Sequence, residues 1–178
     1  MSMILEYRIG LTIEEEGKRV KRNIVMGLIG VLFVLIVGSY SIFYQSQRPI
    51  VQAESEAAAI AEQVGAVQKV EDFFWYNGTD ATYFAVSGYT DADKLVYVVI
   101  KQDGGQTWVF DSNEIVTEDE AKAIVQAVEN PVSMLEARIG IDSDEPFWEV
   151  AYKDANGKLG YYQLSAKTGQ KIKEFKNI

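Results

Sequence analysis

The sequence predicts an α+β protein in which one membrane-spanning helix precedes two similar units, each a helix packed on an antiparallel sheet of three to four strands. Three observations support this fold class. Residues 24–44 form an uncharged apolar run. After residue 51 the hydrophobic period changes from helical to alternating, and it does so twice. The two halves of this region also match one another at a constant spacing.

The apolar run at 24–44 is long enough to cross a membrane. A helix rises about 1.5 Å per residue, so its twenty-one residues reach roughly 32 Å, against a hydrocarbon core of about 30 Å. A cleaved signal peptide is the alternative, but its apolar region normally holds about 7–15 residues and ends at small residues. Here the run is longer and ends in aromatic residues, which favours an uncleaved anchor: Tyr40, Phe43 and Tyr44.

Charges on either side of the run predict its orientation. Arg48 is the first basic residue after it, whereas four stand just before it: Lys18, Arg19, Lys21 and Arg22. Because basic residues accumulate on the cytoplasmic side of a span, we expect the tail 1–23 in the cytoplasm and the chain beyond the linker 45–50 outside. The prediction is a single-pass protein of the cell membrane that contacts the bilayer through residues 24–44.

Composition excludes several classes of function. The chain of 178 residues has a net charge of −9 and contains neither Cys nor His. Thiolate nucleophiles, disulfides, Ser-His triads and the usual zinc sites are therefore excluded, and we expect no cofactor. The region after Pro49 is acidic and would repel polyphosphate, so nucleic acid is not an expected partner.

The first predicted unit covers residues 51–113. Its helix runs from Val51 to Val64, because Ala and Glu are strong helix formers, and Gly65 then ends it. Four runs of alternating β-branched and aromatic residues follow, separated by turn residues. The predicted strands are Val67 to Tyr76, Ala81 to Tyr89, Leu95 to Lys101 and Thr107 to Asp111.

The second predicted unit covers residues 114–178. Thr117 and Glu120 form the pattern of a capping box, which opens a helix that continues through Val128 and ends at Asn130-Pro131. The predicted strands are Ser133 to Ile141, Pro146 to Tyr152, Leu159 to Ser165 and Lys171 to Phe175.

An internal duplication accounts for this order of elements. Lys94-Leu95 matches Lys158-Leu159, and further identities in helix, strands and turns follow the same register without a gap. Among them are Ile60 with Ile124, Val86 with Val150 and Tyr97 with Tyr161. Such matching positions lie 64 residues apart, as Lys94 and Lys158 do, and this spacing is the repeat offset. Each copy is too small to be robust alone, so we expect the two to pack together.

The stretch PFWEVAYKDANGKLGYYQLSAKTGQKIKEF in the second copy resembles the PepSY family. Shared features are an aromatic strand with W-E-V, a D-x-N-G turn, a Tyr-rich strand and a turn ending in T-G. PepSY modules have a cystatin-like shape, a helix laid across an antiparallel sheet. With the anchor and the divergent first copy, YFAVSGYTDADKLVYVVIKQDGGQTWVF, the chain resembles the TseB-like (YpmB) family of Gram-positive bacteria.

This resemblance implies a function but no catalytic residues. The family is described as a regulator of cell-wall elongation that acts outside the membrane on a penicillin-binding transpeptidase. We therefore expect a non-enzymatic regulatory protein that binds such a membrane-bound partner and has no metal or cofactor site. Two alternatives stay open: a PepSY-type inhibitor or folding helper of an exported protease, and a sensor of wall fragments.

Aromatic residues are the candidates for partner binding, because Trp and Tyr dominate interface hot spots. Phe73-Phe74-Trp75-Tyr76 places aromatic side chains on both faces of one strand, so some of them are exposed if one face is solvated. Burial between the two copies is the alternative. The predicted partner-binding residues are Phe74, Trp75, Tyr76, Tyr161 and Tyr162.

Two other motifs are interpreted as turns. Lys167-Thr168-Gly169 spells the K-T-G of penicillin-binding proteins, but the accompanying S-x-x-K and S-x-N are absent, which favours a hairpin. Two acidic clusters lack the ligand spacing of a calcium loop and are expected to be solvated turns. They comprise Asp91 and Asp93, and Asp142, Asp144 and Glu145.

Overall fold

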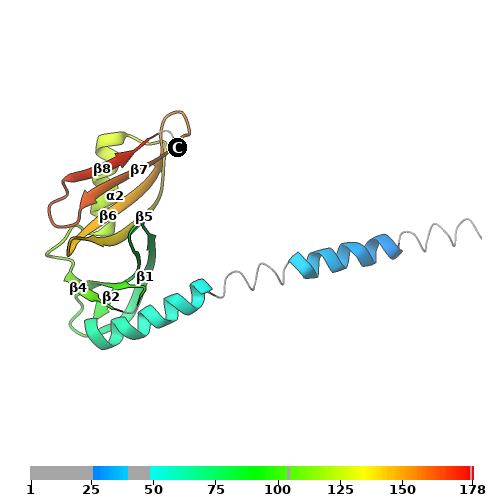
Figure 1. The fold of residues 1–178 in the computed structure, drawn as a ribbon, viewed down its shortest axis with the longest axis horizontal. Helices are drawn as coiled ribbons and strands as arrows, with labels where there is room; N and C mark the ends of the chain where they lie inside the picture. The colour runs from blue at the N-terminus through cyan, green and yellow to red at the C-terminus, as the bar shows by residue number, and fades with distance from the viewer. Residues whose placement is uncertain (1–25, 40–48, 104, 177) are drawn as a thin grey trace, which may run out of the picture. The chain divides into compact units, whose positions relative to one another are not determined.

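The computed structural model describes residues 26–39, 49–103, 105–176 and 178, and divides the chain into two compact units, Met1–Pro49 and Ile50–Ile178 (Figure 1). In the first unit, residues 26–39 are helical and lie within the predicted span. The rest of that span, the tail 1–23 and linker residues 45–48 fall outside the described residues.

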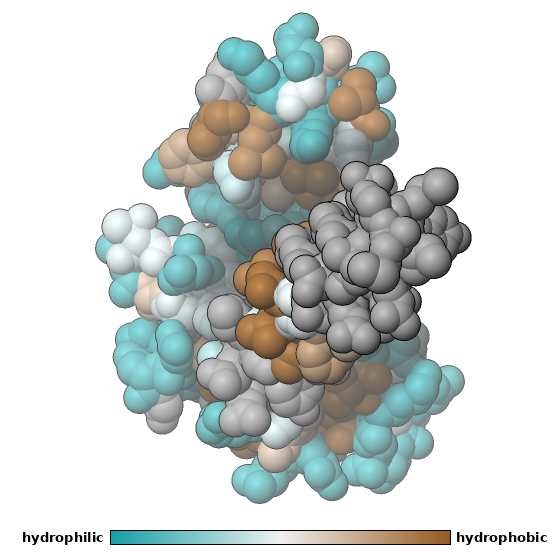
Figure 2. Space-filling model, turned by 90° about the vertical axis from the view of Figure 1, so that its right-hand side faces the viewer, coloured by the Kyte–Doolittle hydropathy of each residue, from teal (hydrophilic) through white to brown (hydrophobic). Residues whose placement is uncertain are grey.

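Every described residue of helix 26–39 is exposed, and large hydrophobic side chains run along it, with Phe33 at 66% exposure and Val34 at 68%. Figure 2 colours hydrophobic residues brown and shows such side chains at the surface of the molecule. Among the described residues, no helix combines the length and apolar character that crossing a membrane requires.

The second unit begins with a helix on a four-stranded sheet, as predicted. Residues 49–65 are helical, so the last two residues of the predicted linker belong to this helix. The antiparallel sheet has the order β1-β2-β3-β4. Its strands are β1 (Val67–Asn77), β2 (Thr82–Thr90), β3 (Leu95–Lys101) and β4 (Thr107–Asp111).

Helix 49–65 covers one face of this sheet. Ala57 and Ala61 are buried against Val86 and Val98, because small side chains let a helix approach a sheet closely. The approach is closest at Gly65, where an added Cβ would lie 2.5 Å from Val98 Cγ2. Gly65 was expected to end the helix, but it is still helical and the left-handed residue at the helix end is Ala66, with φ 52°; Gly65 serves packing instead.

The same arrangement recurs in the second half. Helix α2 (Glu118–Glu129) opens at the predicted capping box and ends at Asn130 in the left-handed conformation, with φ 44°. The second antiparallel sheet has the order β5-β6-β7-β8, and α2 contacts β5 and β6. Its strands are β5 (Ser133–Asp142), β6 (Glu145–Lys153), β7 (Leu159–Ser165) and β8 (Lys171–Phe175).

The α+β fold class and the duplicated element order are confirmed. Strands β3 and β7 begin at positions related by the repeat offset, and so do β4 and β8. The predicted turn Asp142–Glu145 is shorter than expected, because these two residues pair across β5 and β6. Ser143 and Asp144 close the hairpin with φ of 51° and 65°, the backbone that a two-residue type I′ turn requires.

The two halves share one hydrophobic core. Phe74 packs against Tyr97 of its own sheet and against Trp148 of β6, with ring centroids 6.3 and 5.5 Å apart. The Trp148 indole N–H donates to the Val116 carbonyl oxygen at 2.7 Å, and the Glu118 backbone N–H donates to the Tyr97 hydroxyl oxygen at 3.2 Å. The second half therefore covers the face of the first sheet that helix 49–65 leaves free.

The K-T-G segment is a hairpin turn, as expected. Gly169 has φ 71°, its N–H donates to the Ser165 carbonyl oxygen at 2.8 Å, and Lys167 pairs with Glu145. In the described part of the chain, no group of three or more acidic side chains is arranged to hold a metal ion.

Candidate functional site

A cleft of about 580 Å³ lies where the β1–β2 turn of the first half meets the second sheet. Its size falls within the range of about 300–1,000 Å³ that is usual for small-ligand sites. Residues from both halves line it, including Tyr76, Asp80, Lys101, Asp142, Phe147, Glu149, Gln163, Lys173 and Phe175.

Gly140 allows Tyr76 and Phe147, which both line this cleft, to pack closely over β5. An added Cβ there would lie 2.9 Å from both Tyr76 Cδ1 and Phe147 Cζ, closer than real Cβ contacts allow. Without that atom, the Tyr76 ring reaches over β5 and meets Phe147 edge-on, with centroids 5.1 Å apart. Tyr76 and Phe147 thus form an aromatic wall that joins the two halves.

The cleft lies on a face of the second sheet that is more polar than the corresponding face of the first sheet. On the first sheet, Phe74 pairs with Ala85, and Ala85 is buried in the shared core. The counterparts of this pair at the repeat offset are Arg138 and Glu149, which pair on the outer face of the second sheet. Buried Val99 likewise corresponds to Gln163. The face that is apolar and covered in the first half is therefore polar in the second.

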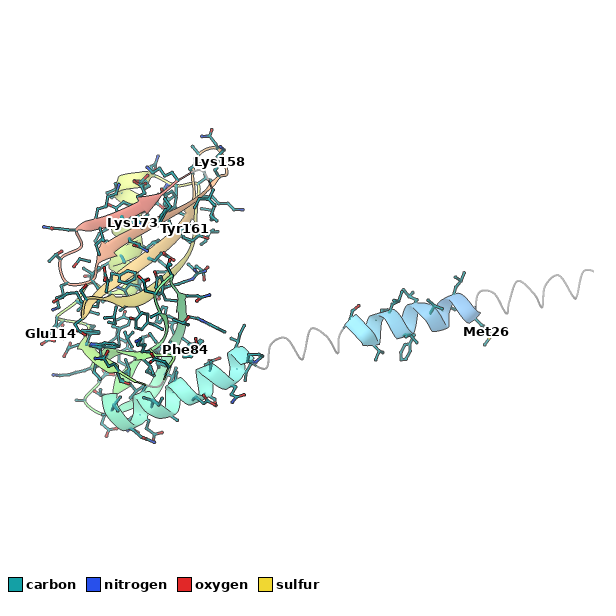
Figure 3. All side chains as sticks on the ribbon, viewed as in Figure 1. Met26, Phe84, Glu114, Lys158, Tyr161 and Lys173 are labelled. Carbon is teal, nitrogen blue, oxygen red and sulfur yellow. The ribbon has the colours of Figure 1, made fainter. Side chains whose placement is uncertain are left out.

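These polar residues form a row across the four strands of the second sheet. Gln163 Nε2 donates to Glu149 Oε2 at 2.9 Å, while Arg138 Nη1 lies 3.6 Å from Glu149 Oε1. Arg138 also pairs with Glu136. Lys173 pairs with Gln163 in the strand register, and its ammonium lies 4.5 Å from the centroid of the Phe175 ring. Figure 3 labels Lys173 on β8 and Tyr161 on the neighbouring β7.

Burial and nearby negative charge raise the pKa of Tyr76. Burial is the larger cause and the charge of Glu149 is the next, whereas the Gln163 amide lowers this pKa; Asp142 and Asp80 make smaller contributions that raise it. Lys101 at the edge of the cleft is paired with Asp103, whose carboxylate lies 3.0 Å from the ammonium. The cleft therefore combines aromatic walls with an excess of carboxylates.

Comparison with known proteins finds a similar family over part of the chain. Residues 56–101 match the family model of the cell wall elongation regulator TseB-like domain. This part of the chain is similar to a TseB-like domain. The matched residues comprise most of helix 49–65 and the strands β1 to β3. No curated protein matches the sequence.

Two solved structures are similar to this chain. The YpmB protein from Bacillus subtilis is 22% identical, with a TM-score of 0.59 over 68% of this chain and 95% of the other, and so shares the fold. A second match, described as a candidate lipoprotein from Clostridium difficile 630, is 15% identical. It has a TM-score of 0.37 over 67% of this chain and 88% of the other.

The five predicted partner-binding residues occupy different environments. Phe74 is 6% exposed and Tyr162 is 4% exposed, so both belong to the core and present little surface to a partner. Trp75 is half-buried on the opposite face of β1, where its ring meets Phe84 edge-on at 5.2 Å. Tyr76 lines the cleft, and Tyr161 is partly exposed on β7. Partner binding by these residues stays a prediction.

Sequence reasoning missed the polar side of the cleft. It did not single out Glu149, Gln163 or Lys173. Two signals could have indicated them: the charged Glu149 inside an otherwise apolar strand, and Gly140 inside a predicted strand, where glycine often marks a close approach. Comparing buried Ala85 and Val99 with their counterparts at the repeat offset required the structure.

Proposed function

We propose that this TseB-like protein is a membrane-anchored, non-enzymatic regulator of cell-wall elongation. In this proposal, the module after the anchor lies outside the cell and binds a penicillin-binding transpeptidase. The observation that carries it is the match of residues 56–101 to the domain of cell wall elongation regulators. The fold shared with YpmB supports it.

The anchor is the second part of the proposal. Helix 26–39 bears exposed hydrophobic side chains along its described length, which is unfavourable in water and favourable in a bilayer. We place it within a span at residues 24–44, with the basic cluster of the tail on the cytoplasmic side.

Tethering explains how a modest binding surface could suffice. A partner held in the same membrane is present at a high effective concentration, so a weak interface gives appreciable occupancy. Trp75 and Tyr161 keep partial exposure and are the predicted contact residues most available to such a partner.

Crosslinking in living cells tests this function. The full chain, carrying an affinity tag, is crosslinked in growing cells, and the captured proteins are identified by mass spectrometry. We expect a penicillin-binding transpeptidase among them. The matched control is a chain whose residues 24–44 are replaced by a cleavable signal peptide, which should capture much less of it. Capture of exported proteases alone, or of nothing, would contradict the proposal.

A further inference from the structure

We infer that the cleft binds the primary ammonium group of a short peptide, which pairs with Glu149 beside Tyr76 and Gln163. This inference goes beyond the proposed function and does not depend on it. It rests on the balance of charge in the cleft, the free bonding capacity of Glu149 and the aromatic walls.

The balance of charge favours a cation. Three carboxylates line the cleft: Asp80, Asp142 and Glu149. Two ammonium groups line it as well, those of Lys101 and Lys173. Lys101 is already paired with Asp103. Glu149 lies 3.6 Å from Arg138, which is outside the cleft and also pairs with Glu136. Asp80 and Asp142 still outnumber Lys173. The surplus of negative charge attracts a positively charged ligand and repels an anionic one.

Glu149 has bonding capacity left for that ligand. Its Oε2 accepts from Gln163, but among the described residues its Oε1 has only the 3.6 Å contact with Arg138, which is longer than a hydrogen bond. Arg138 is shared with Glu136, so one guanidinium faces two carboxylates. A carboxylate can accept about four hydrogen bonds, and this side chain is 13% exposed, so water competes weakly.

The aromatic walls suit the same ligand. The rings of Tyr76 and Phe147 border the cleft, and a ring face attracts an ammonium group. Lys173 shows this contact within the protein itself, since its ammonium lies over the ring of Phe175. A peptide adds an apolar stem that can pack on these rings while its ammonium reaches Glu149.

Calorimetric titration of the full chain in detergent micelles tests the inference with three tripeptides. One is Ala-Lys-Ala with both ends capped, which offers a side-chain ammonium; the second is Ala-Ala-Ala amide, which offers an N-terminal ammonium. The third, Ala-Ala-Ala with both ends capped, has neither. We expect at least one ammonium peptide to bind about tenfold or more tightly than the capped neutral one. Equal binding of all three, or no binding, would overturn the inference.

Two substitutions in the full chain locate the site. Glu149→Gln should weaken the ammonium peptide about tenfold and remove the preference over the neutral one. The matched control is Glu71→Gln, because Glu71 is an exposed carboxylate that pairs with Lys69 and does not line the cleft. It should change affinity by no more than about twofold. An equal loss in both variants, or none in Glu149→Gln, would contradict the assignment.

A third variant distinguishes an effect on binding from an effect of misfolding, because it should raise the affinity. Lys173 is exposed at the edge of the cleft, so Lys173→Glu should leave the fold intact and add negative charge. Affinity for the ammonium peptide should then rise roughly threefold. A fall in affinity in a folded Lys173→Glu protein would overturn the inference.

Discussion

The missing side chain of Gly140 leaves room for two aromatic residues that line the cleft, Tyr76 and Phe147. The counterpart of Gly140 in the first half, at the repeat offset, is Tyr76. The first half thus has a large aromatic residue at this position of the repeat, and the second half has no side chain there. The Tyr76 ring fills the space that a side chain of Gly140 would occupy.

Gly140→Ala should therefore displace Tyr76 or Phe147 and destabilise the protein by about 1–3 kcal/mol, because overpacking forces neighbouring groups to move. Urea unfolding of the full chain, followed by circular dichroism, measures the change. The control is Gly105→Ala, whose added Cβ would meet only the flexible Asp103 side chain at 3.2 Å and should cost no more than about 0.5 kcal/mol. Equal stabilities of the two variants would contradict the packing described at Gly140.

Among the described residues, Tyr152 has the most strongly shifted pKa. It is 1% exposed, and its hydroxyl lies 3.0 Å from Glu174 Oε1 and 3.3 Å from Glu129 Oε2. Lys176 pairs with both carboxylates. Burial first, and then the charge and hydrogen bond of Glu129, raise the pKa of Tyr152 to about 12.

This shift predicts a loss of stability in alkali. The unfolded chain releases the Tyr152 proton near pH 10, whereas the folded protein keeps it up to about pH 12. The contribution is complete below pH ~10 and disappears as the pH rises toward ~12, with a slope of up to about 1.4 kcal/mol per pH unit. Tyr152→Phe should flatten the curve of unfolding free energy in that window. Between pH 6 and 8 the two curves should be parallel, and identical alkaline slopes would contradict the shift.

The start of α2 is fixed by hydrogen bonds between neighbouring side chains and backbone groups. The Thr117 hydroxyl accepts from the Glu120 N–H at 3.3 Å, and the Thr117 N–H donates to Glu120 Oε2 at 2.8 Å. Thr117→Ala should cost about 1 kcal/mol, because the Glu120 N–H loses its partner. Ser55→Ala, on the exposed side of helix 49–65, is the control and should be neutral or slightly stabilising. The midpoints of urea unfolding of the two variants test this cap. Equal midpoints would contradict it.

The elements were predictable because their signals are local. The alternation of hydrophobic residues and the turn residues predicted the observed bounds of β3, β4, β7 and β8. The capping box predicted the start of α2. The cleft depends instead on contacts between residues far apart in the sequence, such as Tyr76 with Phe147. No periodicity specifies such a contact. The sequence could therefore suggest that the two copies pack together, but not which faces meet.

For the whole molecule, the shared core predicts that the two halves unfold together. Phe74 and Tyr97 of the first half contact Trp148 of the second, so neither sheet keeps its core without the other. Urea unfolding of the full chain should show one transition, with the same midpoint by far-ultraviolet circular dichroism and by tryptophan fluorescence. Two separated transitions would show that the halves are independent.

The proposed role of a tethered module in wall elongation is tested by the rate at which growing cells incorporate labelled wall precursor into the side wall. Cells lacking the protein should show an altered rate, and the full chain should restore it. The same chain with residues 24–44 replaced by a cleavable signal peptide should not restore it at equal abundance, because release lowers its effective concentration at the membrane. An unchanged rate in cells lacking the protein, or full restoration by the released chain, would contradict this role.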